Sequence, residues 1–305
     1  MIGRSNFEEI RKLLISSTSV LRWLHLNNVF DTANVSSLIY VCLKTECPQQ
    51  SFIYQKADNV IQWQYGTVES MIIKIPQLSE NDSYKVVFAA EDDLSILTHL
   101  RKFPTFEESF IMWRGEEIGK KDSVILSSHV SGSIPILTGE NVHRYEMPIP
   151  SRWIPKENVH KDTALYKRPK LLIRQLGDKI NATIDTAGMV STQSVYSLVP
   201  LNKDGSEESL LFYLGLLNSS LFDFIYRLTS GDKQLFKRIV LENIKALPLP
   251  DKVSCENIRL LASYAQQCLH ADEILAPTEE AIDNLVFSLY RLPPNMIEIV
   301  KGGVS

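Results

Sequence analysis

The first 43 residues of this chain carry one helix-like stretch followed by two strand-like stretches. Phe7, Ile10 and Leu14 recur at the spacing of one helical face. Residues 20–26 are compatible with a strand, and residues 35–43 form a nearly continuous apolar run that is typical of a strand buried on both faces. Because one helix and two strands cannot enclose a hydrophobic core, we expect this region to complete a larger α/β sheet whose other strands lie outside the chain.

The next region, residues 48–104, alternates short apolar runs with polar and proline-containing turns. The runs at residues 59–65, 71–75 and 84–88 predict strands, and residues 93–102 predict a short helix. We therefore expect a strand-rich connector here.

The central region contains the pattern of a β-hairpin. Residues 170–174 and 179–184 are apolar runs on either side of Gly177 and Asp178, a pair that favours a turn. Residues 195–199 predict a further strand. Strands joined in this way favour an antiparallel or mixed sheet.

Helices are predicted on the C-terminal side of these strands. Residues 209–228 carry an apolar stripe at helical spacing and predict one long helix. A short helix is expected at residues 241–246, and two longer helices are expected at residues 255–270 and 278–292.

Charge is unevenly placed along the 305 residues, whose formal net charge is −4. Residues 143–179 contain nine Lys and Arg against four Asp and Glu, a local charge of about +5. A second basic stretch follows at residues 227–245, and the last fifty residues are acidic. A basic stretch of this kind is either a footprint for nucleic acid or a solvated face.

Composition and motifs argue against several classes of protein. No apolar run reaches the roughly 18 residues of a membrane span, and no signal-peptide core follows the N-terminus, so we expect a cytoplasmic location. The four cysteines form no CxxC pair, which favours free thiols in a reducing compartment. Since no phosphate-binding glycine loop, HExxH or GxSxG motif occurs, we predict no catalytic, cofactor-binding or metal-binding residue, and a hydrolase is disfavoured.

Six segments, in a fixed order and over nearly the whole chain, resemble the motifs of one protein family. The segments are residues 7–43, 134–145 (IPILTGENVHRY), 169–186, 211–227 (LFYLGLLNSSLFDFIYR), 235–250 and 282–300. Together they resemble the C-terminal part of TaqI-like adenine-N6 DNA methyltransferases and of the single-chain restriction–modification enzymes built on the same plan.

The resemblance implies an α+β fold. A mixed or antiparallel-sheet target-recognition domain with packed helices would follow a helix–strand–strand remnant of an α/β methyltransferase domain. Tyr40 and Cys42 both stand near the position that packs on a flipped adenine in the family, and the resemblance leaves that role open. The implied divisions are a methyltransferase remnant at residues 1–47, a strand-rich connector at 48–104, a DNA target-recognition domain at 105–250 and a helical segment at 251–305.

The implied function is sequence-specific recognition of double-stranded DNA for a site-specific adenine-N6 DNA methyltransferase of a restriction–modification or related defence system. The chain departs from the family because it lacks the glycine motif for S-adenosylmethionine and the Asn-Pro-Pro-Tyr motif that holds a flipped adenine. Pro293 and Pro294 have Leu292 before them and Asn295 after them, so we interpret them as a helix stop. We therefore expect a fragment or subunit that is not catalytic by itself. S-adenosylmethionine would bind to the catalytic domain, a partner in cis or in trans.

The resemblance also implies DNA contacts from basic and amide side chains of the central region. Lys and Arg bind phosphates, Arg pairs bidentately with guanine, and Asn or Gln pairs with adenine. Gln175 in the hairpin and Asn141 suit the adenine role. The candidate DNA-binding residues are Arg114, Thr138, Asn141, Arg144, Lys170, Arg174, Gln175, Lys179, Lys237 and Arg238. Each is also compatible with an ordinary surface role.

A second hypothesis is a non-enzymatic interaction subunit of a defence complex, whose acidic C-terminal helices bind a partner protein. It predicts no affinity for DNA even at low salt, whereas the first hypothesis predicts salt-dependent binding to duplex DNA.

Overall fold

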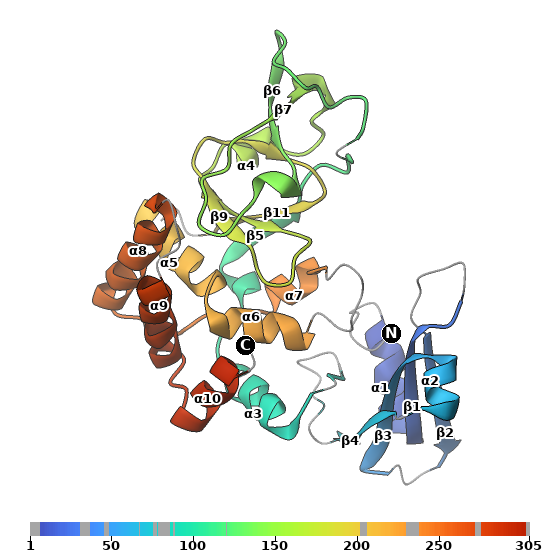
Figure 1. Cartoon of the computed structure of the whole chain (residues 1–305). Helices are drawn as coiled ribbons and strands as arrows, with labels where there is room; N and C mark the ends of the chain where they lie inside the picture. Colours follow the sequence, from blue (N-terminus) through green and yellow to red (C-terminus); the bar gives the residue numbers. More distant parts are fainter. Residues whose placement is uncertain are drawn as a thin grey trace. The chain divides into compact units, whose positions relative to one another are not determined.

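The computed structural model describes residues 7–30, 37–45, 49–66, 68–75, 78, 86–87, 89–119, 121–201, 206–229, 238–271 and 276–302. The chain forms two compact units, residues 1–90 and 91–305 (Figure 1). Strands and helices are mixed in both units, so the α+β fold class that the sequence predicts is confirmed. Each unit is described by itself below.

The N-terminal unit is a four-stranded sheet in the order β2-β1-β3-β4. Strand β1 pairs antiparallel with β2 and parallel with β3, and β3 pairs antiparallel with β4. The elements are α1 (Glu8–Ser17), β1 (Thr18–Asn28), β2 (Ser37–Lys44), β3 (Ser51–Asn59), α2 (Val60–Tyr65) and β4 (Glu69–Lys74). This sheet therefore joins strands on both sides of residue 47, the position at which the sequence divides remnant from connector.

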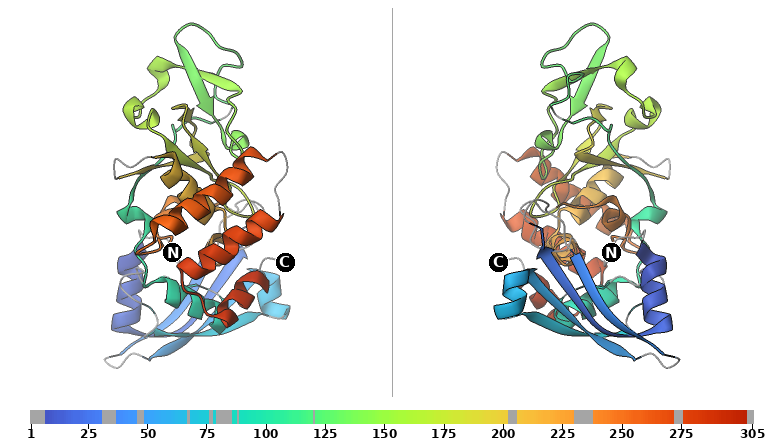
Figure 2. Two further views of the ribbon diagram at one scale, coloured as in Figure 1. Left: turned by 90° about the vertical axis from the view of Figure 1, so that its left-hand side faces the viewer. Right: turned by 90° about the vertical axis from the view of Figure 1, so that its right-hand side faces the viewer.

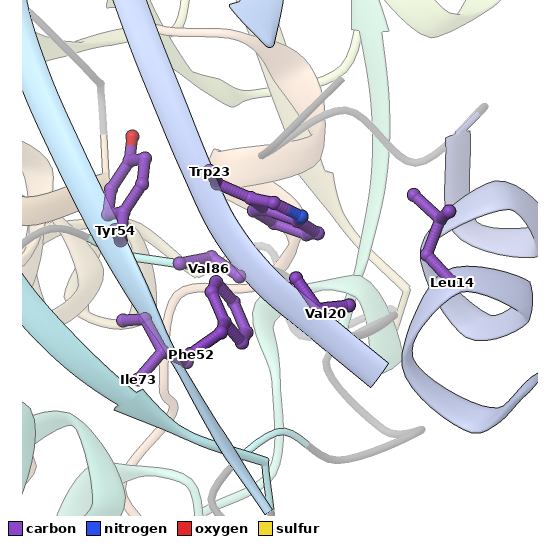
Figure 3. Packing of buried hydrophobic residues seen from close by; sticks show 7 residues of the cluster. All are labelled: Leu14, Val20, Trp23, Phe52, Tyr54, Ile73 and Val86. Carbon is purple, nitrogen blue, oxygen red and sulfur yellow. The ribbon is translucent and has the colours of Figure 1, made fainter. Parts of the chain in front are cut away.

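One face of this sheet carries the core of the unit. Figure 3 shows its seven side chains, with Leu14 coming from α1 and the others from the sheet and from Val86. The rings of Trp23 and Phe52 lie 4.8 Å apart between their centroids. Residues that are paired across neighbouring strands point to the same face of a sheet, so Trp23 and its β3 partner Tyr54 both enter this core.

Strand β2 forms as predicted but is not buried on both faces. Ile39, Tyr40, Val41 and Leu43 are 47–55% exposed, on both faces of the strand. Within this chain β2 is an outer strand whose partner among the described residues is β1, so the burial on both faces that its apolar run predicts requires strands from outside the chain.

The connector also differs from its prediction. Residues 59–65 form helix α2 rather than a strand, since the side chain of Asn59 caps the helix by accepting a hydrogen bond from the Gln62 N–H at 2.8 Å. Strand β3 has no counterpart in the sequence prediction. The strand expected at residues 71–75 is confirmed by β4. The strand expected at residues 84–88 lies largely outside the described residues.

The C-terminal unit contains two sheets. The larger has the order β5-β11-β8-β9 with every pair antiparallel, and the smaller has the order β10-β6-β7. The predicted hairpin is confirmed, since β8 and β9 pair from Lys170↔Asp185 to Ile173↔Ala182. The strands are β5 (Phe110–Arg114), β6 (Ser133–Leu137), β7 (Arg152–Pro155), β8 (Lys170–Arg174), β9 (Ala182–Asp185), β10 (Val190–Ser191) and β11 (Val195–Pro200).

The larger sheet is covered on both faces. On one face, Leu172 and Val195 pack against Leu137 beside the smaller sheet. On the other face lie α5 (Glu207–Leu217) and α6 (Ser220–Thr229), on the side away from β6 and β7 (Figure 1). Phe110 of β5 meets Tyr213 of α5 edge to face at 4.7 Å between ring centroids.

The sequence predicts one helix over residues 209–228, but the structure has two, α5 and α6, bent by 56°. The break falls at Asn218, whose N–H still bonds to the Leu214 carbonyl while its side chain turns to strand β9. No single helix among the described residues is long and apolar enough to cross a membrane. The bent pair α5–α6 meets that test by length and composition only.

Of the remaining helices, α9 and α10 pack on α6, and α8 packs on α5. Helices α7 and α8 agree closely with the predictions at residues 241–246 and 255–270. Helix α9 ends at Leu289, four residues before Pro293, and Pro294 begins a further helix, α10. Helices α8 and α9 run side by side in the left view of Figure 2. These helices are α3 (Glu91–Leu100), α7 (Leu241–Lys245), α8 (Cys255–His270), α9 (Ala276–Leu289) and α10 (Pro294–Gly302).

Candidate nucleic-acid interface

The turn between β8 and β9, residues 175–181, is held by hydrogen bonds on two sides; we call it the hairpin turn. Its second half is bonded to α6. The Tyr226 hydroxyl donates to the Gly177 carbonyl at 2.9 Å, and the Ile180 N–H donates to Asp223 Oδ1 at 2.9 Å. Both backbone groups of Ala182 bond to the Asn218 amide, at 3.1 and 3.0 Å.

The first half of the hairpin turn is held on its other side. The Gln175 N–H donates to the Ser194 carbonyl at 2.9 Å, and the Ile239 N–H donates to the Gln175 carbonyl at 3.0 Å. The Gln175 side chain is buried and donates to the Tyr196 hydroxyl at 2.9 Å. The prediction that Gln175 binds an adenine is therefore wrong, because its amide is used inside the protein.

Three of the predicted basic residues gather at this turn. Arg174 ends β8 and is half-buried, and Lys179 is exposed within the turn itself. Arg238 is exposed and forms a backbone bridge with Leu176. Lys237 lies outside the described residues. The turn thus presents three cations on a fixed backbone, and their contact with DNA stays a prediction.

Arg114 lies at the same end of the larger sheet. Arg114 and Ile173 pair with the same residue, Tyr196, from opposite sides of β11. The Arg114 guanidinium donates to Gln193, from Nε to the backbone carbonyl at 2.7 Å and from Nη2 to Oε1 at 3.0 Å. Its side chain is 33% exposed. The guanidinium is therefore oriented by the protein and still open to solvent.

Thr138 and Asn141 form a capping box around the 3₁₀ turn η5 (Gly139–Asn141). The Thr138 N–H donates to Asn141 Oδ1 at 2.9 Å, and Asn141 Nδ2 donates to the Ile149 carbonyl at 3.1 Å. Thr138 is buried, so the prediction that it contacts DNA is wrong. Asn141 is half-buried, and its amide shapes the loop after β6.

Arg144 is an internal residue. Its guanidinium donates to Asp223 Oδ2 at 3.0 Å and to the Asn218 carbonyl, and it pairs with Glu279 of α9 at 3.3 Å. Burial lowers the pKa of Arg144, and the carboxylates of Asp223 and Glu279 raise that pKa by more. The prediction of a DNA contact from Arg144 is wrong because its charge is balanced by carboxylates within the unit.

Lys170 is also internal, with a side chain that is fully buried. Its ammonium donates to Asp185 Oδ2 at 2.5 Å and to the Tyr166 carbonyl at 2.6 Å. Burial lowers the pKa of Lys170, and the Asp185 carboxylate opposes that shift. A side chain in this position cannot reach a phosphate, so this prediction is wrong as well.

The residues that hold the hairpin turn were missed at the level of sequence. The helix predicted over residues 209–228 carries an apolar stripe that indicates packing. No role was predicted for the polar groups of Asn218, Asp223 and Tyr226 within it. The available signal was an acidic residue, Asp223, inside the apolar run LFDFIYR, because a buried carboxylate needs a partner. Within the part of the chain that the structure describes, no group of three or more His, Cys, Asp or Glu is placed to hold a metal ion.

The central part of the chain is similar to a known protein family. Residues 134–249 match the family model of the TaqI-like C-terminal specificity domain. The match includes the hairpin turn, α6 and α7, and it ends before α8.

A solved structure shares the fold at low sequence identity. The chain is similar to the type IIL restriction–modification enzyme MmeI in complex with DNA, with a TM-score of 0.53, 11% identity, and coverage of 94% of this chain and 45% of that chain. It also matches the type IIG restriction endonuclease BpuSI, with a TM-score of 0.45, 10% identity, and coverage of 95% and 46%. The chain therefore spans less than half the length of these enzymes. No curated protein matches it.

Proposed function

We propose that this chain recognises a specific sequence in double-stranded DNA for an adenine-N6 DNA methyltransferase of a restriction–modification or related defence system. The observation that carries the proposal is the hairpin turn inside a TaqI-like specificity domain, which presents Arg174, Lys179 and Arg238 on a fixed backbone. The proposed place of action is the cytoplasm, where Cys42, Cys255 and Cys268 stay free thiols.

The cations at this end of the sheet have different roles in the proposal. Lys179 and Arg238 are exposed and suit phosphates, which set register and much of the affinity. Arg114 suits a guanine edge, because Gln193 holds two of its donors and Glu117 lies 3.5 Å from its Nη1, so that the half-exposed guanidinium keeps one orientation. Turns on a rigid sheet are favourable places for such contacts.

A catalytic domain, in cis or in trans, is the proposed protein partner, and S-adenosylmethionine is proposed to bind there. The support in this chain is strand β2, whose apolar residues Ile39, Val41 and Leu43 are exposed beside a parallel strand pair. Sheets with parallel pairs are normally covered on both faces. An edge strand that stays in solvent normally carries charge or proline. Strand β2 thus has the character of an interior strand of a larger sheet.

The test is a titration of duplex DNA at several salt concentrations, starting from a pool of random-sequence duplexes to select a preferred site. The two phosphate contacts from Lys179 and Arg238 would give log Kobs a slope of about −1.8 against log salt, since each contact contributes about 0.9. Lys179→Gln is expected to reduce that slope by about 0.9. The control is Arg259→Gln, an exposed cation on α8 that should leave the slope unchanged. Absence of binding at every salt concentration would overturn the proposal.

An interaction subunit without DNA binding is the competing function. The exposed apolar side chains of β2 favour a protein partner under either function. The titration separates the two, because only the competing function predicts no affinity for duplex DNA at low salt.

A further inference from the structure

Three polar side chains, two from α6 and one from the break between α5 and α6, bond to the hairpin turn and its strand β9. They are Asn218, Asp223 and Tyr226, which we call the turn-holding residues. All three are buried, with exposed fractions of 1%, 7% and 2%. Buried polar groups are unfavourable unless they are hydrogen-bonded, so their partners show what they stabilise.

Their partners are backbone groups of the hairpin strands and turn. The β8–β9 ladder ends at Ile173↔Ala182, and beyond it the hairpin makes one more bond, from the Arg174 N–H to the Asn181 carbonyl. Past that bond, the Gly177 carbonyl accepts a hydrogen bond from the Tyr226 hydroxyl, and the Ile180 N–H donates to the Asp223 carboxylate. Because these bonds go to the backbone, they fix the path of the turn whatever side chains it carries.

The turn-holding residues are themselves held by a part of the chain that lies outside the family match. Asp223 pairs with Arg144, and Arg144 pairs with Glu279 of α9. The Ser220 N–H at the start of α6 donates to Asp283 Oδ1, also of α9, at 2.8 Å. Helix α9 therefore fixes α6, and α6 fixes the hairpin turn.

We propose that Asn218, Asp223 and Tyr226 are positioning residues for sequence recognition: they keep the hairpin turn in one conformation, so that Arg174, at the start of the turn, is already oriented when it meets the bases. This inference rests on the proposed DNA recognition. Binding to phosphates tolerates a mobile backbone because it is electrostatic, whereas base contacts need fixed geometry. Loosening the turn should therefore lower the preference for the specific sequence and leave binding to DNA in general unchanged.

The experiment compares two tyrosine-to-phenylalanine variants of the full chain. Tyr226→Phe removes the bond to the Gly177 carbonyl at 2.9 Å. Tyr290→Phe is the matched control, since it removes an equivalent bond from a buried hydroxyl to the Pro248 carbonyl at 2.7 Å, away from the turn. Both keep the ring, so both are expected to fold.

Two quantities are measured. The first is the ratio of affinities for the selected duplex and for a scrambled duplex of equal length. We expect Tyr226→Phe to lower this ratio about 5-fold, the effect of losing one hydrogen bond, with no change in the salt dependence of binding to the scrambled duplex. The second is amide hydrogen exchange of residues 177–182 without DNA, which should be about 5-fold faster in Tyr226→Phe. The control should change neither.

The outcomes separate this inference from the proposed function. If the unaltered chain binds neither duplex, the proposed function fails and the inference fails with it. If the chain binds with a sequence preference that Tyr226→Phe leaves intact, the inference alone is overturned. An equal loss of affinity for both duplexes also overturns it, because a general loss of binding is not a loss of sequence recognition.

Discussion

Lys170→Met tests whether the basic charge of the central region is internal or available to DNA. Methionine is nearly as long as lysine and fills the same space, so the substitution removes the charge with little change in packing. In the folded unit it leaves the Asp185 carboxylate fully buried without its cation. The carboxylate keeps three backbone N–H donors, from Ala187, Gly188 and Met189.

The expected loss follows from that geometry. Removing one partner of a buried ion pair costs about 3–5 kcal/mol because the other charge stays in a poorly solvated site. Because three N–H donors still stabilise the carboxylate, we expect Lys170→Met to lower the free energy of unfolding by about 3 kcal/mol, the lower end of this range. The matched control is Lys179→Met, in which an exposed lysine of the hairpin turn is changed in the same way. A surface substitution of this kind changes stability by less than about 0.5 kcal/mol.

The assay is urea unfolding of the C-terminal unit, with duplex titration on the same preparations. Lys170→Met should lower the unfolding midpoint and leave the salt dependence of DNA binding unchanged. Lys179→Met should leave the unfolding midpoint unchanged and reduce the salt dependence of DNA binding. The reasoning is refuted if Lys170→Met is as stable as the unaltered chain and reduces the salt slope, because Lys170 would then be exposed to the duplex.

Two further predictions concern close packing and a buried thiol. A Cβ on Gly115 would lie 2.3 Å from the Thr192 carbonyl oxygen, so Gly115→Ala should destabilise the C-terminal unit by about 2 kcal/mol in urea unfolding. Gly119→Ala should not, because its Cβ would come no closer than 4.0 Å to a neighbouring atom, Nε2 of Gln193. Burial raises the pKa of the Cys268 thiol to about 11, so thiol labelling at pH 8 should modify exposed Cys255 and spare Cys268. Because the pKa is higher in the folded state, the free energy of unfolding that the neutral thiol contributes is present below pH 9 and is lost as the pH rises towards 11. Equal labelling of the two thiols, or equal stability of the two alanine variants, would contradict these expectations.

Local sequence pattern predicted much of the secondary structure of the C-terminal unit. Helix α8 and the β8–β9 hairpin depend on periodicity and turn residues within a short window, and both agree with the prediction. The break between α5 and α6 was missed because it depends on Asn218 bonding to β9, a strand 36 residues away in sequence. Helix α2 was missed for a local reason, the cap supplied by Asn59.

The direction in which a polar side chain points was harder to predict. Lys170 begins β8, whose next three residues are buried on both faces of the sheet. A strand buried on both faces leaves its first residue little access to solvent, and this signal was present in the run KLLIR. For Arg144 there was no such signal, because its partners Asp223 and Glu279 lie far along the chain.

These internal ion pairs reduce the net charge that residues 143–179 can offer to DNA. The segment 143–179 has a charge of about +5 by composition. Two of its cations, Arg144 and Lys170, are neutralised by Asp223 and Asp185, carboxylates from outside the segment, so the charge offered to a ligand is about two units smaller. Of the remaining cations of the segment, Arg174 and Lys179 lie at the hairpin turn, where Arg238 joins them from outside the segment. The hairpin turn thus offers a small set of cations on a fixed backbone, and fixed geometry is what sequence recognition requires beyond charge.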